Sequence, residues 1–128
     1  MPIALDHIIL KVNDTEESVA FYTRVLSLGY EGTQGPFSVL RVTPAFTIQL
    51  AAWGSEGGEH LAFALEPKEF DAAFARIREA GVAYGDSFHS VGNMKGPGEE
   101  AGARGNGRAL YFFDPSKHLL EIRSYDTA

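Results

Sequence analysis

The 128-residue sequence contains no cysteine, which excludes disulfides and thiolate-bound metal sites. It also lacks an excess of positive charge, since the formal net charge is -6 and the pI is about 5.1. Such a chain offers no basic surface to nucleic acid or to an anionic membrane. No apolar run approaches the length of a membrane span, and no basic segment followed by an apolar one begins the chain. We therefore expect a cytoplasmic protein whose partner is a small molecule or another protein.

Composition indicates a chain that folds. Hydrophobic residues make up 45% and charged residues 22% of the sequence, with nine Phe and five Tyr, which argues against disorder. A chain of this length fits one domain, 1–128, with a sizeable core.

The first half of the sequence predicts a strand, a helix and then about three strands. Asn13 or Asp14 would cap the helix, and Gly29 would end it. The alternation of apolar and polar residues places the strands at 5–12, near Tyr30, at 37–42 and at 46–53.

The second half repeats this order, with a helix that begins at Pro67 and ends at Gly81. Its strands are predicted at 59–65, 82–88, 108–113 and 118–125. A glycine-rich insert, 89–107, has no counterpart in the first half. So long an irregular stretch in a compact domain is usually functional or disordered. The predicted organisation is module one, 1–54, and module two, 55–128.

The spacing of equivalent residues supports the repeat. His7 and His60, early in the first strand of each half, are 53 positions apart. Gln49 and Glu121, in the last strand of each half, are 72 apart, and the excess of 19 equals the length of the insert. Two βαβββ modules are therefore predicted, an α+β fold with mixed sheets.

Strand alternation gathers the polar side chains on one face of the sheets. If apolar residues such as Leu10 and Ile122 pack against the helices, the neighbouring polar residues point to the opposite face. The residues predicted on that concave face are His7, Arg41, Gln49, His60, Tyr111, Glu121, Arg123 and Tyr125.

The segments "LDHIILKVNDTEESVAFYTRVLSLGY", "EHLAFAL" and "GRALYFFDPSKHLLEIRSY" resemble the vicinal oxygen chelate superfamily, the glyoxalase, bleomycin-resistance and extradiol-dioxygenase group. The resemblance spans nearly the whole chain and implies paired βαβββ modules whose curled sheets enclose a divalent metal ion in a central cup. It implies His7, His60 and Glu121 as the metal ligands. A glycine-containing turn usually precedes the glutamate in that family, and 116–118 replaces it here.

Two imidazoles and one carboxylate are suitable ligands for Fe, Mn, Co, Ni or Zn and leave adjacent coordination positions open. A metal ion held in this way can chelate two neighbouring substrate oxygens, act as a Lewis acid or bind O₂. The alternative for Glu121 is a structural salt bridge with Arg123 or Arg41, which needs no metal.

Comparison within the superfamily leaves the reaction open. Glyoxalase I resembles this chain at "TIQL" but has a glutamate where Gln49 stands, and an amide cannot act as its base. Tyr111 matches a phosphonate-contacting tyrosine of fosfomycin-resistance enzymes, whereas Ile9 replaces their catalytic threonine. The metal triad is similar to that of extradiol dioxygenases, which usually have four modules.

The remaining candidate residues have both functional and structural interpretations. Tyr111 and Arg123 are the candidate catalytic residues, and the alternative for Tyr111 is a core aromatic with a satisfied hydroxyl. The candidate substrate-binding residues are Arg41, Gln49, Trp53 and Tyr125. The alternatives for Gln49 are a weak metal ligand, a hydrogen-bond partner of a ligand, or a residue in the wall of the cup. Trp53 and Phe37 are either residues in that wall or ordinary core aromatics. The insert is a substrate lid, through Asn93, Lys95 and Arg104, or a solvated or dimer-contacting loop.

These observations predict a metal-dependent enzyme, with one divalent ion per site, that acts on a small substrate with adjacent oxygens. The reaction is interpreted as dioxygenase-like or as that of a lyase or isomerase. The alternatives are a bleomycin-resistance-like binder of drugs or metabolites and a fosfomycin-resistance-like metalloenzyme. The family implies a homodimer, often with His7 from one chain and the other two ligands from its partner.

Overall fold

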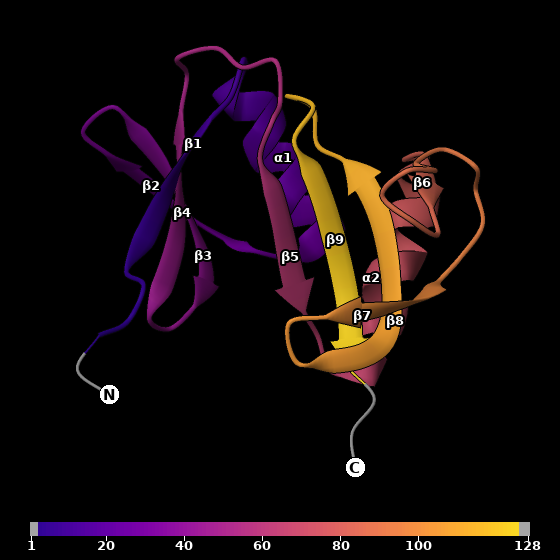
Figure 1. Cartoon of the computed structure of the whole chain (residues 1–128). Helices are drawn as coiled ribbons and strands as arrows, with labels where there is room; N and C mark the ends of the chain where they lie inside the picture. The colour runs from indigo at the N-terminus through magenta and orange to yellow at the C-terminus, as the bar shows by residue number, and fades with distance from the viewer. Residues whose placement is uncertain (1–2, 126–128) are drawn as a thin grey trace. The chain divides into compact units, whose positions relative to one another are not determined.

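The computed structural model describes residues 3–125, which form two compact units divided between Glu56 and Gly57 (Figure 1). The sequence predicted a module boundary between residues 54 and 55. Each unit has its own sheet and helix and is described by itself. Neither helix in the described part of the chain is long and apolar enough to cross a membrane.

The first unit contains one helix and a four-stranded mixed sheet. Strand β1 is parallel to β4, and the sheet continues through antiparallel pairs in the order β1-β4-β3-β2. The helix α1 contacts β2, β3 and β4. The elements are β1 (His7–Lys11), α1 (Thr15–Leu26), β2 (Gly29–Gln34), β3 (Phe37–Thr43) and β4 (Phe46–Ala51).

The second unit follows the same plan with an additional hairpin. Its main sheet has the order β5-β9-β8-β6, in which β5 is parallel to β9, and β7 pairs with β8 (Figure 1). The helix α2 contacts β9. The elements are β5 (His60–Ala64), α2 (Pro67–Glu79), β6 (Tyr84–Gly85), β7 (Gly98–Gly102), β8 (Gly105–Phe113) and β9 (Leu119–Tyr125).

The strand registers of the two units agree residue by residue. Gln49 on β4 lies between Ile9 of β1 and Val39 of β3. Glu121 on β9 lies in the same way between Ala62 of β5 and Tyr111 of β8. The predicted α+β class and the predicted repeat of the βαβββ order are confirmed.

Local sequence explains where the helices begin and end. The Asp14 side chain caps α1 by accepting a hydrogen bond from the Glu17 backbone N–H at 3.1 Å. The helix ends at Ser27, with φ 59°, so the prediction that Gly29 ends it was wrong. Gly29 is instead the first residue of β2. In the second helix Pro67 is the first residue, and Gly81, at φ 71°, follows the end as predicted.

Apolar side chains between each helix and its sheet form the cores. In the second unit the helix contributes Phe70, Ala73 and Ile77, which are fully buried. The strands contribute the alternate residues Leu110, Phe112, Leu120 and Ile122, all fully buried. The intervening residues of β8 and β9 therefore point to the other face of the sheet, as the alternation predicted.

The segment around the glycine-rich insert differs from the prediction. The strand predicted at 82–88 is reduced to Tyr84–Gly85, because the Tyr84 carbonyl accepts hydrogen bonds from the backbone N–H groups of Gly92 and Met94. The following loop thus folds back on this short strand. Part of the insert is ordered as β7, and β8 begins at Gly105 rather than at residue 108.

His118 lies in the turn before β9 and not in the strand. The Asp114 side chain organises this turn by accepting hydrogen bonds from the Ser116 and His118 backbone N–H groups at 2.8 and 2.9 Å. The His118 ring is buried and accepts a hydrogen bond from the Glu59 N–H at 3.3 Å. This turn fixes the start of β9, two residues before Glu121.

Candidate metal centre and its surroundings

Two potential metal ligands, His60 and Glu121, lie together on the face of the second unit's sheet that points away from α2. The parallel pairing of β5 with β9 brings the two side chains together, and His60 Nε2 lies 3.0 Å from Glu121 Oε1. The His60 side chain is about half exposed at 47%, whereas Glu121 is 6% exposed. Two adjacent ligands that are each about 2.1 Å from one ion and at right angles lie about 3 Å apart. The two donor atoms therefore fit one divalent cation.

The third predicted ligand, His7, belongs to β1 of the first unit. Its Nδ1 lies 2.8 Å from Asp6 Oδ2, and its side chain is substantially exposed. Within residues 3–125 the structure contains no group of three His, Cys, Asp or Glu side chains arranged to hold a metal ion. The complete set of three ligands remains a prediction.

Arg123 binds the second oxygen of the Glu121 carboxylate. Its Nη1 donates to Glu121 Oε2 at 2.7 Å, and its Nη2 donates to the Glu100 carbonyl on β7 at 2.8 Å. The structural ion pair that the sequence left as an alternative is thus present, but it uses a different oxygen from the one that faces His60. The carboxylate is available to a metal ion through Oε1 while Arg123 holds Oε2.

Tyr111 lies opposite Glu121 in the strand register. Burial, followed by the negative charges of Glu121 and Glu100, raises the pKa of the Tyr111 phenol to about 12. The phenol therefore remains protonated at neutral pH and acts there as a hydrogen-bond donor. Its ring centroid lies 6.3 Å from that of His60 and 6.3 Å from that of Phe88.

Phe88 and His89 form an aromatic pair beside Tyr111 that the sequence reasoning did not assign to the site. Their ring centroids are 3.9 Å apart, and Phe88 is half exposed despite its apolar ring. Both residues come from the loop after β6. Their position depends on how this loop folds, which the residue pattern did not indicate.

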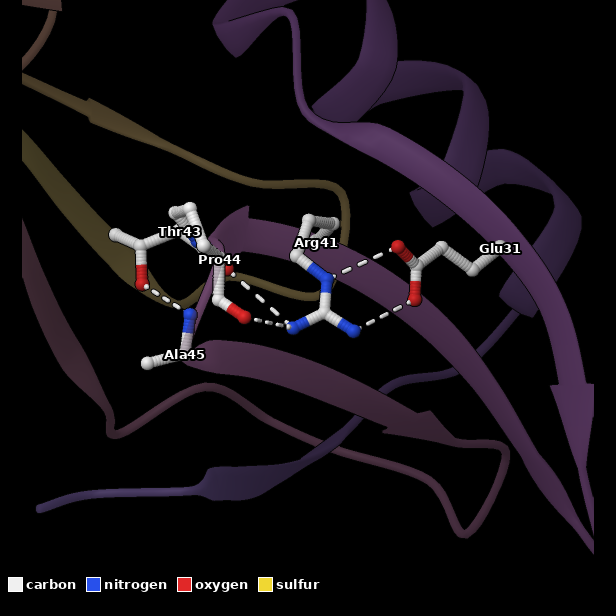
Figure 2. Close-up of polar contacts among 5 residues, drawn as sticks. All are labelled: Glu31, Arg41, Thr43, Pro44 and Ala45. Atoms are coloured by element: carbon white, nitrogen blue, oxygen red, sulfur yellow. Dashed lines mark hydrogen bonds and ion pairs between the residues drawn. The ribbon is translucent and has the colours of Figure 1, made fainter.

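Arg41 lies in the first unit, on β3, and is neutralised by a neighbour on β2 (Figure 2). Its Nε and Nη2 donate to the two carboxylate oxygens of Glu31 at 2.9 and 3.0 Å, and Nη1 donates to the carbonyls of Pro44 and Thr43. The hydrogen bond from Arg41 lowers the pKa of the Glu31 carboxyl, and the same bond raises the pKa of Arg41. Its predicted role as a substrate-binding residue remains a prediction.

The other predicted substrate-binding residues are divided between the units. Gln49 is half-buried on β4, and Trp53 is 58% exposed with its ring at an edge to that of Phe37. Tyr125 ends β9, where the guanidinium groups of Arg104 and Arg123 lie 4.4 and 4.6 Å from its ring centroid. Their contacts with a substrate remain predictions.

The polar residues of the insert have partners within the unit. The Asn93 side chain donates to Asp86 Oδ1 at 2.9 Å and accepts from the Lys95 backbone N–H at 2.9 Å. Arg104 lies over Tyr125. These contacts order the insert, and whether it covers a substrate remains a prediction.

Two residues that shape the centre were not among the candidates, Glu100 and Gly102. Glu100 contributes its backbone carbonyl, which every residue type has, so no sequence signal marks it. A glycine in a strand does indicate a close approach, and a Cβ at Gly102 would fall on the Arg123 guanidinium, 2.6 Å from Nε and 2.7 Å from Nη1.

A family model described as the Glyoxalase/Bleomycin resistance protein/Dioxygenase superfamily matches residues 4–122. The chain belongs to this superfamily. The resemblance noted in the sequence is thereby confirmed.

Two named proteins are similar in sequence to this chain. Metallothiol transferase FosB from Shouchella clausii (strain KSM-K16) is 27% identical over 129 residues, 94% of this chain and 79% of that protein. Glyoxalase domain-containing protein RDO1 from Mycosarcoma maydis is 27% identical and covers 98% of this chain and 70% of that protein.

Solved structures show the same fold. Oxidase ChaP-H2 has a TM-score of 0.82 and 28% identity, and the match covers 100% of this chain and 98% of that one. A variant of the fosfomycin resistance protein FosX from Listeria monocytogenes, complexed with Mn(II) and 1S,2S-dihydroxypropylphosphonic acid, has a TM-score of 0.70 at 24% identity. That match covers 96% of this chain and 90% of FosX and concerns the fold alone.

Proposed function

We propose that the chain is an enzyme that uses one divalent metal ion to act on a small substrate with two neighbouring oxygens. The ligands are His60 and Glu121 of the second unit and His7 of the first. The observation that carries the proposal is the 3.0 Å distance between His60 Nε2 on β5 and Glu121 Oε1 on β9. The favoured reaction is dioxygenase-like, and the similarity to oxidase ChaP-H2 over the full chain supports this choice.

The bound ion would supply Lewis acidity and adjacent coordination positions for the substrate oxygens. The chain's own groups have separate tasks around it. His60 and Glu121 hold the ion through one atom each, and the protonated Tyr111 phenol donates a hydrogen bond near the carboxylate. The half-exposed Phe88 ring provides an apolar wall beside Tyr111.

Metal analysis of the purified protein tests the proposal. We expect about one metal ion per chain in the wild type after reconstitution with Fe²⁺ or Mn²⁺ under anaerobic conditions. His60→Ala and Glu121→Ala should each abolish stoichiometric binding, while Asp71→Ala, an exposed carboxylate on α2, serves as the matched control and should bind like the wild type. A wild type that takes up no divalent metal would refute the enzyme proposal.

Chelation separates the enzyme from a binder of drugs or metabolites. The enzyme should lose both its metal and its affinity for small diols after dialysis against EDTA. A binding protein of the bleomycin-resistance type should retain its small-molecule affinity after the same treatment, measured by calorimetry.

Mixed dimers test the source of His7. If the protein is a homodimer whose sites take His7 from one chain and His60 from the other, a His7→Ala chain and a His60→Ala chain together form one intact site per mixed dimer. We expect the mixture, after unfolding and refolding together, to recover metal that each variant alone lacks. No recovery in verified mixed dimers would indicate that each site forms within one chain.

A second candidate function is the metal-dependent modification of fosfomycin, by addition of a thiol or of water. The similarity to metallothiol transferase FosB and the position of Tyr111 opposite Glu121 favour it. Ile9, which offers no hydroxyl group, argues against it. Incubation of the Mn²⁺-loaded protein with fosfomycin, with and without a thiol, distinguishes the two candidates: consumption of fosfomycin supports the second one.

A further inference from the structure

The Arg123 side chain connects three strands, β9, β8 and β7, in the second unit. It begins on β9, where its register partner on β8 is Ala109, and it reaches the Glu100 carbonyl on β7. The connection is nearly closed to solvent, because Arg123 is 3% exposed and Ala109 is fully buried.

Gly102 provides the space in which the guanidinium lies. A Cβ at this position would overlap the guanidinium group, so a larger residue would require the Arg123 side chain or the hairpin of β7 and β8 to shift. Within residues 3–125, Arg123 Nε is buried and makes no hydrogen bond. Burial of a charged donor in this way is costly, and the chain retains it together with a short bond to each of two partners.

The two bonds of Arg123 have different consequences. The bond to Glu121 Oε2 leaves Oε1 as the oxygen that faces His60 and limits the rotation of the carboxylate. The bond to Glu100 attaches the hairpin to the same guanidinium. A change in one bond must therefore affect the other through a single rigid, planar group.

We propose that Arg123 is a positioning residue that presents Glu121 to the metal ion through Oε1 alone. The same guanidinium couples this geometry to the docking of the β7–β8 hairpin, in which Gly102 leaves the space that the guanidinium fills. This inference rests on the proposed function for the metal ion, whereas the coupling to the hairpin stands without it. Arg123 was a candidate catalytic residue in the sequence. In the structure it acts through Glu121.

Hydrogen exchange in the metal-free protein tests the coupling. Glu121→Gln should make the hairpin amides at 98–105 exchange about tenfold faster, a size typical of coupled sites, because Glu121 is linked to β7 through the Arg123 guanidinium. His60→Ala is the matched control, because it removes the partner of Oε1 and should leave the hairpin unchanged. Equal exchange in Glu121→Gln and the wild type would overturn the coupling.

Titration with Mn²⁺ tests the positioning. Arg123→Met keeps the apolar stem and should weaken Mn²⁺ binding roughly 10–100-fold, as is usual when the group that orients a ligand is removed. Arg123→Lys should restore part of the affinity, since an ammonium group can still reach Glu121 but not both partners. Unchanged Mn²⁺ affinity in a folded Arg123→Met protein would overturn the positioning role.

Gly102→Ala keeps the test decisive if Arg123→Met does not fold. It displaces the guanidinium while keeping the arginine, and we expect both faster hairpin exchange and weaker Mn²⁺ binding. A wild type that binds no Mn²⁺ would refute the proposed function and with it the positioning role, while the exchange measurements would still decide the coupling. The two failures are therefore distinguishable.

Discussion

Arg123 and Arg41 each bind a carboxylate through hydrogen bonds of 2.7 to 3.0 Å, but in opposite surroundings. The pair of Arg123 with Glu121 is almost completely buried, with side-chain exposures of 4% and 6%. In the pair of Arg41 with Glu31, each side chain is about 40% exposed. A buried charge must keep its partner, because no water can replace it. An exposed pair exchanges its partner for water at little cost. Similar geometry therefore predicts different effects of mutation.

Removal of the buried arginine should have the largest effect on stability. Arg123→Met leaves Glu121 with an uncompensated buried charge, and we expect a loss of about 3–5 kcal/mol in the free energy of unfolding. Urea denaturation followed by circular dichroism measures it. The double variant Arg123→Met with Glu121→Gln should be more stable than the single one, and a single variant as stable as the wild type would contradict the comparison.

A side chain at position 102, in the space that the Arg123 guanidinium occupies, should have an intermediate effect on stability. Gly102→Ala forces the Arg123 side chain or the hairpin to move, at a cost of about 1–3 kcal/mol, the usual range for an overfilled site. Gly105→Ala is a control without a steric conflict, although its φ of 116° adds backbone strain that the comparison must include. Equal Tm values for the wild type and Gly102→Ala would indicate that the hairpin does not lie against Arg123.

The buried phenol beside the pair should make stability depend on pH in the alkaline range. In the folded metal-free protein the pKa of Tyr111 is about 12, against 10.0 for an ordinary tyrosine. The unfolded chain therefore loses this proton first, so the contribution of Tyr111 is constant below pH 10 and falls as the pH rises towards 12. Thermal denaturation between these values should show a steeper loss in the wild type than in Tyr111→Phe. Identical slopes would refute the assignment.

The exposed pair should give the smallest effect. Arg41→Met and Glu31→Gln should each change Tm by no more than the error of the measurement at physiological salt, because solvent and ions screen the pair. Since Arg41 lowers the pKa of Glu31, any contribution is present at neutral pH and is lost as the pH falls through that lowered pKa. A large loss of stability in Arg41→Met would show that exposure does not distinguish the two pairs.

The sequence predicted the part of the site that strand alternation controls. The repeat placed His60 and Glu121 at positions equivalent to His7 and Gln49, and the resemblance implied them as ligands; their side chains do lie together. The alternation also placed Tyr111 and Arg123 on the same face as Glu121. These predictions succeeded because a period of two residues determines the face on which a side chain lies.

The remaining features depend on contacts that residue types do not reveal. Glu100 contributes through its backbone carbonyl, and the hairpin that carries it begins in a glycine-rich segment without apolar alternation. The partner of Arg41 was also missed, because Glu31 is on a strand whose pattern was too irregular to define its faces. The proposed role of His7 would depend on the arrangement of the modules, which the local pattern does not encode.

The spacing of Glu121 and Arg123 on β9 has a consequence for how this strand finds its place during folding. The two residues are separated by one apolar residue, Ile122. A shift of the β9 register by one position against β5 and β8 would place both charged side chains in the hydrophobic core beneath α2 and expose Ile122. Such a misaligned strand would carry three errors at once. The charged side chains of Glu121 and Arg123 thus also favour the correct register of β9.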